Sequence, residues 1–159
     1  MRLVARPGEP SYCRLSVNTQ FLCRPKHLMK VGRNNFKPPP KVESSVVQII
    51  PRTPLPAVAF EEWDGLVRIC FQRKNRTLSS LFRQANVLRL LGRNRATLAG
   101  QQGSMDADDD EEVQLDEERT RVLAVLEAAD ALDSRARTMA INDFLSLLVK
   151  FSEAGYRFS

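Results

Sequence analysis

The sequence predicts a mixed α/β fold in which one helix and two strands precede an all-helical part. Three observations support this prediction. A β-branched run at residues 44–50 is typical of a strand, apolar residues recur at helical spacing from Phe60 onward, and the proline-rich stretch PRTPLPAV at residues 51–58 separates the two patterns. Since such a stretch forms a stiff linker, we expect one domain at residues 1–52 and a helical domain at residues 53–159.

The first domain is expected to contain a helix followed by a strand pair. Ser11 is a candidate cap for a helix from Tyr12 to Cys23, which Pro25 should end. The segment HLMKVG at residues 27–32 is typical of a strand closed by its glycine, and residues 44–50 give the second strand. One helix and two strands cannot bury a core alone, so this domain must pack on the rest of the chain or on a sheet outside it.

The connection between the two strands is the most unusual stretch, NNFKPPPKVESSVV. Three consecutive prolines make a stiff, extended segment, with Phe36 just before it and Lys41 just after it. A stiff loop of this kind could present the Phe36 ring to a flat ligand such as a nucleobase. The alternative is that Phe36 is a core residue beside a turn, and spacing alone favours that alternative.

The helical domain is predicted from the spacing of its apolar residues. We expect helices over residues 60–72, 78–91, 115–132 and 141–151, with Thr77 capping the second, and a solvated acidic loop at residues 103–118. Ala140 stands at the cap position of the last helix and lacks a capping oxygen. The basic junction RKNRT carries Arg73, Lys74 and Arg76 at the start of a helix, where it could hold a phosphate or could simply be a solvated corner.

Charge is divided unevenly along the 159 residues. The chain has a net charge of +5, yet residues 1–100 carry eighteen Lys and Arg against five Asp and Glu, and residues 101–159 carry six against fourteen. A basic first part suits a polyanion such as RNA, although it does not distinguish RNA from DNA.

Several classes of protein and site are not expected. The chain has no apolar run of about 18 residues for a membrane helix, and its first ten residues, MRLVARPGEP, lack an apolar signal core. Cys13, Cys23 and Cys70 are odd in number and form no CxxC pair, so we expect reduced intracellular thiols and no zinc site. The single histidine, His27, has no cluster of metal ligands to join, and a lone histidine is more often structural than catalytic.

The motif FKPPPKVESSVV resembles the end of the catalytic domain in the rRNA adenine dimethyltransferase family. The segments YCRLSVNTQ, HLMKVGRNNF and WDGLVRICFQRKNRTL resemble the eukaryotic small-subunit members, and the resemblance covers nearly the whole chain, most weakly at residues 91–116. It implies that Phe36 lies against a flipped target adenine and that the RKNRT junction lies near the cleft. On this basis we expect Phe36 to be the catalytic stacking residue, and Lys37, Lys41, Arg73, Lys74 and Arg76 to face RNA.

The resemblance also implies parts that this sequence does not contain. Family members bind S-adenosylmethionine at a glycine-rich turn and grip the adenine amine with an Asn/Asp-x-Pro-aromatic motif. Here no two glycines stand in GxG spacing, and no proline precedes an aromatic residue. We therefore expect the C-terminal part of such an enzyme: the last helix and strand pair of a Rossmann-like methyltransferase domain, without the cofactor site, followed by a small helical domain.

Two functions stay open on this reading. In the first, the chain is part of an S-adenosylmethionine-dependent enzyme that dimethylates adjacent adenines of small-subunit rRNA within a pre-ribosomal particle. In the second, it is a non-catalytic RNA-binding and ribosome-assembly module. A helical DNA-binding protein ranks last. The resemblance implies a nucleolar location, and we expect a monomer without a membrane contact.

Overall fold

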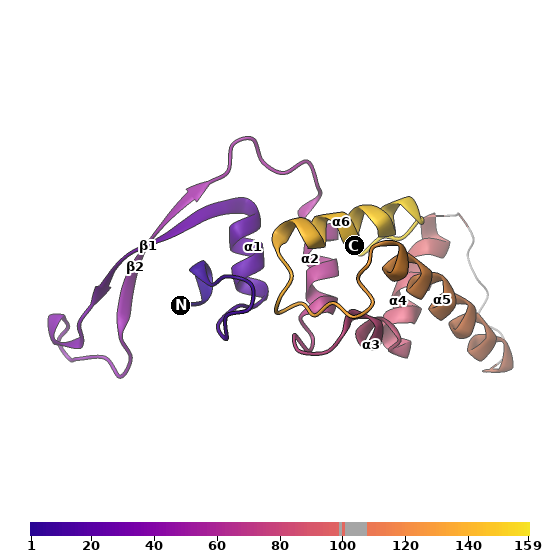
Figure 1. Ribbon diagram of the computed structural model, residues 1–159, viewed down its shortest axis with the longest axis horizontal. Coiled ribbons are helices and arrows are strands. Elements are labelled where there is room, and N and C mark those ends of the chain that lie inside the picture. The colour runs from indigo at the N-terminus through magenta and orange to yellow at the C-terminus, as the bar shows by residue number, and fades with distance from the viewer. Residues whose placement is uncertain (99, 101–107) are drawn as a thin grey trace. The chain divides into compact units, whose positions relative to one another are not determined.

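The computed structural model describes residues 1–98, Gly100 and residues 108–159. The chain divides into two compact units, Met1–Ala57 and Val58–Ser159. The first unit contains η1 (Arg2–Val4), α1 (Arg14–Leu22), β1 (Cys23–Val31), η2 (Arg33–Asn35) and β2 (Ser44–Pro51) (Figure 1). The second contains α2 (Phe60–Cys70), α3 (Leu78–Phe82), α4 (Ala85–Leu98), α5 (Asp108–Ala128) and α6 (Ile141–Glu153). The predicted mixed α/β class is confirmed.

Two polar side chains on α1 attach the N-terminal segment to this helix. The Ser16 hydroxyl donates to the Arg2 carbonyl at 2.5 Å, and the Gln20 amide donates to the carbonyls of Leu3 at 3.1 Å and Ala5 at 2.8 Å. Ser16 also accepts a hydrogen bond from the Cys13 N–H at 3.1 Å. The predicted Ser11 cap is therefore wrong, because the helix begins after Cys13 and is capped from within its first turn.

The strands β1 and β2 form a two-stranded antiparallel ribbon. Cys23 pairs with Pro51 and His27 with Val47, and a bulge at Leu28 shifts the register so that Met29 pairs with Val46. The strand was expected to begin at residue 27, but it begins directly at the end of α1 and includes Pro25. A two-stranded sheet has only edge strands, where a missing N–H is tolerated, so Pro25 does not interrupt it.

The second unit is built around an aromatic core. Phe144 on α6 contacts Trp63 on α2 with ring centroids 6.2 Å apart, and Phe82 on α3 stacks on Phe151 at 5.2 Å. Apolar residues from all five helices surround these rings and are almost completely buried: Leu66, Leu78, Leu88, Leu91, Leu126 and Leu147. None of the helices in the described part of the chain has both the length and the apolar character needed to cross a membrane.

Helix boundaries differ from the sequence prediction at several places: α2 ends at Cys70 and not at residue 72, and α5 ends at Ala128 and not at residue 132. The single helix expected over residues 78–91 is two helices, α3 and α4, separated at Arg83 and Gln84. The acidic loop expected at residues 103–118 is wrong from Asp108 onward, because α5 begins there; residues 103–107 lie outside the described part. The last helix extends to Glu153, and the N–H of its N-cap residue, Ala140, is satisfied by the Asp143 carboxylate at 2.7 Å.

The last four residues fold back onto the second unit. The Glu62 carboxylate on α2 accepts hydrogen bonds from the N–H groups of Phe158 at 2.8 Å and Ser159 at 3.1 Å. Gly65, one turn further along α2, lies directly beneath the tail: a Cβ there would stand 2.3 Å from the Phe158 carbonyl oxygen. Since Phe158 is 6% exposed and packs edge-on against Phe151 at 5.2 Å, the tail completes the core.

Candidate nucleic-acid interface

The β1–β2 connection places Phe36 at the end of the ribbon opposite α1 (Figure 1). Gly32 precedes the short helix η2, whose turn is closed by the Phe36 N–H donating to the Arg33 carbonyl at 3.2 Å. The Asn35 amide also donates to the Gly32 carbonyl at 3.1 Å. These local bonds fix the chain up to Phe36, and the three prolines that follow restrict the next residues.

The side chain of Phe36 lies outside the core and is 40% exposed. Lys37 and Lys41, at either end of the proline triplet, are exposed as well. The structure therefore brings an accessible aromatic ring and two cations together on one connection of the ribbon. Such a combination can stack on a base while the cations contact the neighbouring phosphates.

The α2–α3 turn holds the second group of predicted residues. Arg73 and Arg76 are exposed and Lys74 is half-buried. The Arg76 N–H donates to the Arg73 carbonyl at 2.9 Å, which tightens the turn. The predicted Thr77 cap is confirmed, because its hydroxyl oxygen accepts the Ser80 N–H at 3.3 Å at the start of α3.

Two further arginines lie beside this turn. Thr77 forms an isolated antiparallel bridge with Arg135, and the Arg135 guanidinium donates to the Asn75 carbonyl at 3.1 Å. The Arg137 N–H donates to the Lys74 carbonyl at 3.1 Å. Sequence reasoning missed Arg135 and Arg137, because about sixty residues separate them from the turn and only the backbone pairing reveals their position.

The predicted site residues form two groups on different units. Phe36, Lys37 and Lys41 belong to the first unit, and Arg73, Lys74 and Arg76 belong to the second. Within the described part of the chain, no three His, Cys, Asp or Glu side chains gather as metal ligands, and the three cysteines are free thiols. The first group offers an aromatic ring and cations, which suit a base and its phosphates, whereas the second group offers cations alone, which suit an anion.

Comparison with known families gives these two groups of residues a context. The family model described as ribosomal RNA adenine dimethylase matches residues 1–106. The chain belongs to the ribosomal RNA adenine dimethylase family. The match includes the first unit, the α2–α3 turn and every predicted site residue.

Individual relatives extend the similarity over the remaining residues. The chain is 51% identical to a probable dimethyladenosine transferase of Dictyostelium discoideum, over 99% of this chain and 49% of the relative. It is 45% identical to a dimethyladenosine transferase of Saccharomyces cerevisiae, over 100% of this chain and 50% of the relative. The chain thus spans about half the length of these dimethylase relatives.

A solved structure shares the fold. A crystal structure of a dimethyladenosine transferase from Plasmodium falciparum superposes with a TM-score of 0.83 at 35% identity, over 99% of this chain and 55% of that one. The elements described here therefore correspond to elements of a dimethylase of known structure.

Proposed function

We propose that this chain holds a small-subunit rRNA hairpin for dimethylation of two adjacent adenines, with S-adenosylmethionine as the methyl donor. The observation that carries the proposal is the exposed Phe36 ring on the same connection as the exposed Lys37 and Lys41, in a chain that belongs to the ribosomal RNA adenine dimethylase family. An adenine flipped out of the hairpin stacks on Phe36, and the cations hold the phosphates on either side of it.

The described residues do not themselves fit S-adenosylmethionine. A cofactor of this kind is held where a glycine-rich turn follows a parallel strand, and the strands described here form one antiparallel pair. Gly32 is the glycine that follows β1. A Cβ at this position would meet only the Asn35 side-chain amide, at 3.5 Å, so Gly32 is not required for the close approach of a cofactor to the backbone. We assign the cofactor site to the part of the longer relatives that this chain does not span, and we propose that this chain corresponds to the C-terminal part of such an enzyme.

The contribution of this chain to methyl transfer is positional. The adenine amine is a poor nucleophile, because its lone pair is delocalised into the ring, until the base is fixed in one orientation. The rigid loop holds the Phe36 ring, and the stacked base is therefore held in one plane for attack on the donor methyl. Stacking of this kind contributes about 1–3 kcal/mol per base, which is offset in binding by the few kcal/mol that flipping the base out of the hairpin costs.

The stacking role is tested by Phe36→Ala in a protein extended to the length of the relatives. The matched control is Val42→Ala, since Val42 is an exposed apolar residue of the same connection, 71% exposed. We expect Phe36→Ala to slow methylation of an rRNA hairpin about 10-fold or more while changing its affinity little, since phosphate contacts supply most of the affinity. Equal losses in rate and affinity, or equal effects of both variants, would refute stacking.

The basic turn is tested by the salt dependence of hairpin binding. Arg73→Gln with Arg76→Gln should lower the slope of log affinity against log salt by roughly 1–2, because each phosphate contact contributes about 0.7–0.9. Arg119→Gln with Lys150→Gln, on α5 and α6 of the same unit, removes equal charge and should leave the slope unchanged. An unchanged slope in the Arg73→Gln, Arg76→Gln variant would show that the α2–α3 turn does not contact the RNA phosphates.

The alternative function is a non-catalytic RNA-binding and ribosome-assembly module, and the single antiparallel strand pair favours it for the 159-residue chain alone. Calorimetry with S-adenosylmethionine should then give no binding heat, whereas saturable binding would restore an enzymatic role to the isolated chain. We place the protein, as a monomer, on the pre-ribosomal particle in the nucleolus. A fluorescent fusion excluded from nucleoli would contradict that location.

A further inference from the structure

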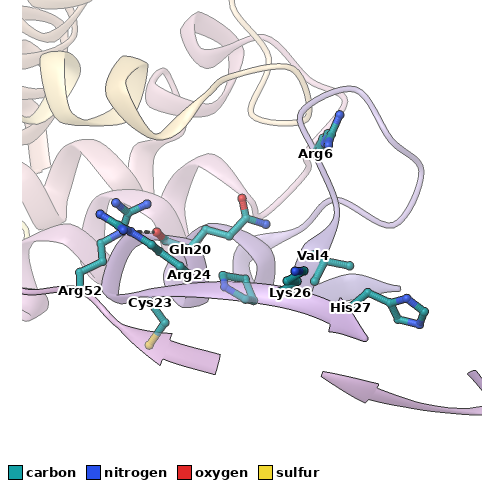
Figure 2. Close-up of a pocket in the computed structure, with 9 residues that line it drawn as sticks. Val4, Arg6, Gln20, Cys23, Arg24, Lys26, His27 and Arg52 are labelled. Carbon is teal, nitrogen blue, oxygen red and sulfur yellow. Dashed lines mark hydrogen bonds between the residues drawn. The ribbon is translucent and has the colours of Figure 1, made fainter. Parts of the chain in front are cut away.

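The first unit contains a basic pocket at the end of the ribbon nearest α1. Its volume is about 520 Å³, and four arginine or lysine side chains line it: Arg6, Arg24, Lys26 and Arg52. Figure 2 shows that these residues come from three segments, the loop after η1, the start of β1 and the residue after β2. The pocket is thus far along the ribbon from Phe36, which stands at its other end.

Hydrogen bonds hold these three segments in place. The Arg52 guanidinium Nε donates to the Gln20 carbonyl at 3.0 Å, drawn as a dashed line in Figure 2, and the Arg52 N–H donates to the Leu22 carbonyl at 2.8 Å. Gln20 in turn donates to the Ala5 carbonyl, which fixes the backbone next to Arg6. Pairing of Cys23 with Pro51 then brings Arg24 and Arg52 to the same end of the ribbon.

The pocket has a strong positive charge without internal compensation. None of its lining residues is acidic, and no carboxylate within the described part of the first unit forms an ion pair with the four cations. Like charges gathered at one place repel each other, and an anion bound between them removes that repulsion. Guanidinium groups favour phosphate in particular, because their planar N–H groups match two phosphate oxygens.

We propose that this pocket binds a backbone phosphate of the RNA, as a contact separate from the β1–β2 connection. The inference rests on the proposed function, because it takes the rRNA as the source of the phosphate. Apart from His27, no lining residue is aromatic, so the pocket offers a base little to stack on and suits the phosphodiester. The hairpin therefore contacts both ends of the ribbon, a base at Phe36 and a phosphate at Arg24 and Arg52.

The test compares two variants of the 159-residue chain, each of which removes one positive charge from β1. Arg24→Gln alters the pocket, and Lys30→Gln removes an equally exposed cation of β1 that lies outside it. Arg24 is preferred over Arg52 because Arg52 also holds the α1 carbonyl. Affinity for an rRNA hairpin is measured across a range of salt concentrations. Amide chemical shifts of Gln20, Cys23 and Lys26 are followed with pyrophosphate and, separately, with polyglutamate.

We expect Arg24→Gln to weaken hairpin binding about three- to fivefold near physiological salt, and to lower the salt slope by about 0.7–0.9, while Lys30→Gln leaves the slope unchanged. Pyrophosphate should shift the three amides of the wild type, and this shift should be lost in Arg24→Gln. Equal effects of the two variants on hairpin binding would overturn the proposal that the pocket binds a phosphate of the RNA. Polyglutamate shifting the amides as strongly as pyrophosphate would also overturn it, in favour of an acidic protein partner.

The outcomes separate this inference from the function on which it rests. If Arg24→Gln binds the hairpin like wild type while Arg73→Gln with Arg76→Gln lowers the slope, RNA binding stands and the pocket proposal fails. If the wild-type chain binds no hairpin at any salt concentration, both the pocket and the proposed function fail.

Discussion

Replacing Gly65 with alanine should destabilise the second unit, although alanine is the better helix former. A Cβ at this position would stand 2.3 Å from the Phe158 carbonyl oxygen and 2.8 Å from the Phe158 Cβ, so the tail must move by about 1 Å to reach an ordinary contact. The movement weakens the two hydrogen bonds to Glu62 and partly exposes the Phe158 ring.

The magnitude follows from opposing contributions. Alanine in a helix interior gains about 1 kcal/mol over glycine. Weakening two hydrogen bonds to a carboxylate and part of the burial of one phenylalanine loses about 3–4 kcal/mol. We therefore expect a net loss of roughly 2–3 kcal/mol in the free energy of unfolding.

Urea unfolding followed by tryptophan fluorescence measures this loss. The chain has one tryptophan, Trp63, which is fully buried on α2, so the signal reports the second unit. The control is Gly92→Ala on α4, where the new Cβ would meet only the Glu118 side chain at 3.8 Å, and it should stabilise by about 0.5–1 kcal/mol. A double variant of Gly65→Ala with Glu62→Gln should lose less than the sum of the single losses, because both act through the tail. If Gly65→Ala is as stable as Gly92→Ala, the docking of the tail is refuted.

Three further predictions concern stability. Burial and the neighbouring Glu118 carboxylate raise the pKa of Tyr156 above the usual value of about 10. The phenol of Tyr156 therefore ionises at a lower pH in the unfolded chain than in the folded chain, so the free energy of unfolding should fall as pH rises above about 10. This fall should be smaller in Tyr156→Phe, and identical pH profiles of the two proteins in denaturant titrations would contradict the prediction. Ala140→Ser should add about 0.5–1 kcal/mol to stability by giving α6 a capping oxygen in addition to the Asp143 contact, and an unchanged urea midpoint would contradict this. Arg95→Leu should lose about 1–2 kcal/mol, because Glu118, 7% exposed, loses the nearer of its two arginines, at 3.0 Å. The loss stays below that of a fully buried pair because Arg95 is 38% exposed and Arg121 remains at 3.8 Å from the carboxylate. A loss below about 0.5 kcal/mol by the same urea titration would rule the pair out as a stabiliser.

Local signals in the sequence predicted the features that depend on neighbouring residues. The Thr77 cap and the start of the last helix at Ile141 depend on side chains within one turn, and both were found where expected. The strand at residues 44–50 was also placed within one residue of its end, because its β-branched run is unambiguous.

Features that depend on distant contacts could not be predicted. The break between α3 and α4 has no proline or glycine to mark it. At the start of α3, the N–H groups of Leu78 and Ser79 donate to carbonyls of the segment before α6, Ser134 at 2.9 Å and Leu132 at 3.1 Å. The position of Arg135 beside the basic turn comes from the same pairing. Likewise, the basic pocket depends on the register of the ribbon, which joins Arg24 to Arg52 across twenty-eight residues of chain, and composition alone showed only that the region is positive.

The bulge at Leu28 gives the ribbon a role beyond connecting two binding points. A bulged residue bends its strand and increases the local twist, and this one lies between the pocket and the loop that carries Phe36. The extra residue therefore influences the direction in which the ring projects relative to the basic pocket. A chain without Leu28 would retain every charge and the aromatic ring, yet would present them along a different line, so one unpaired residue sets how the pocket and the ring are arranged along the ribbon.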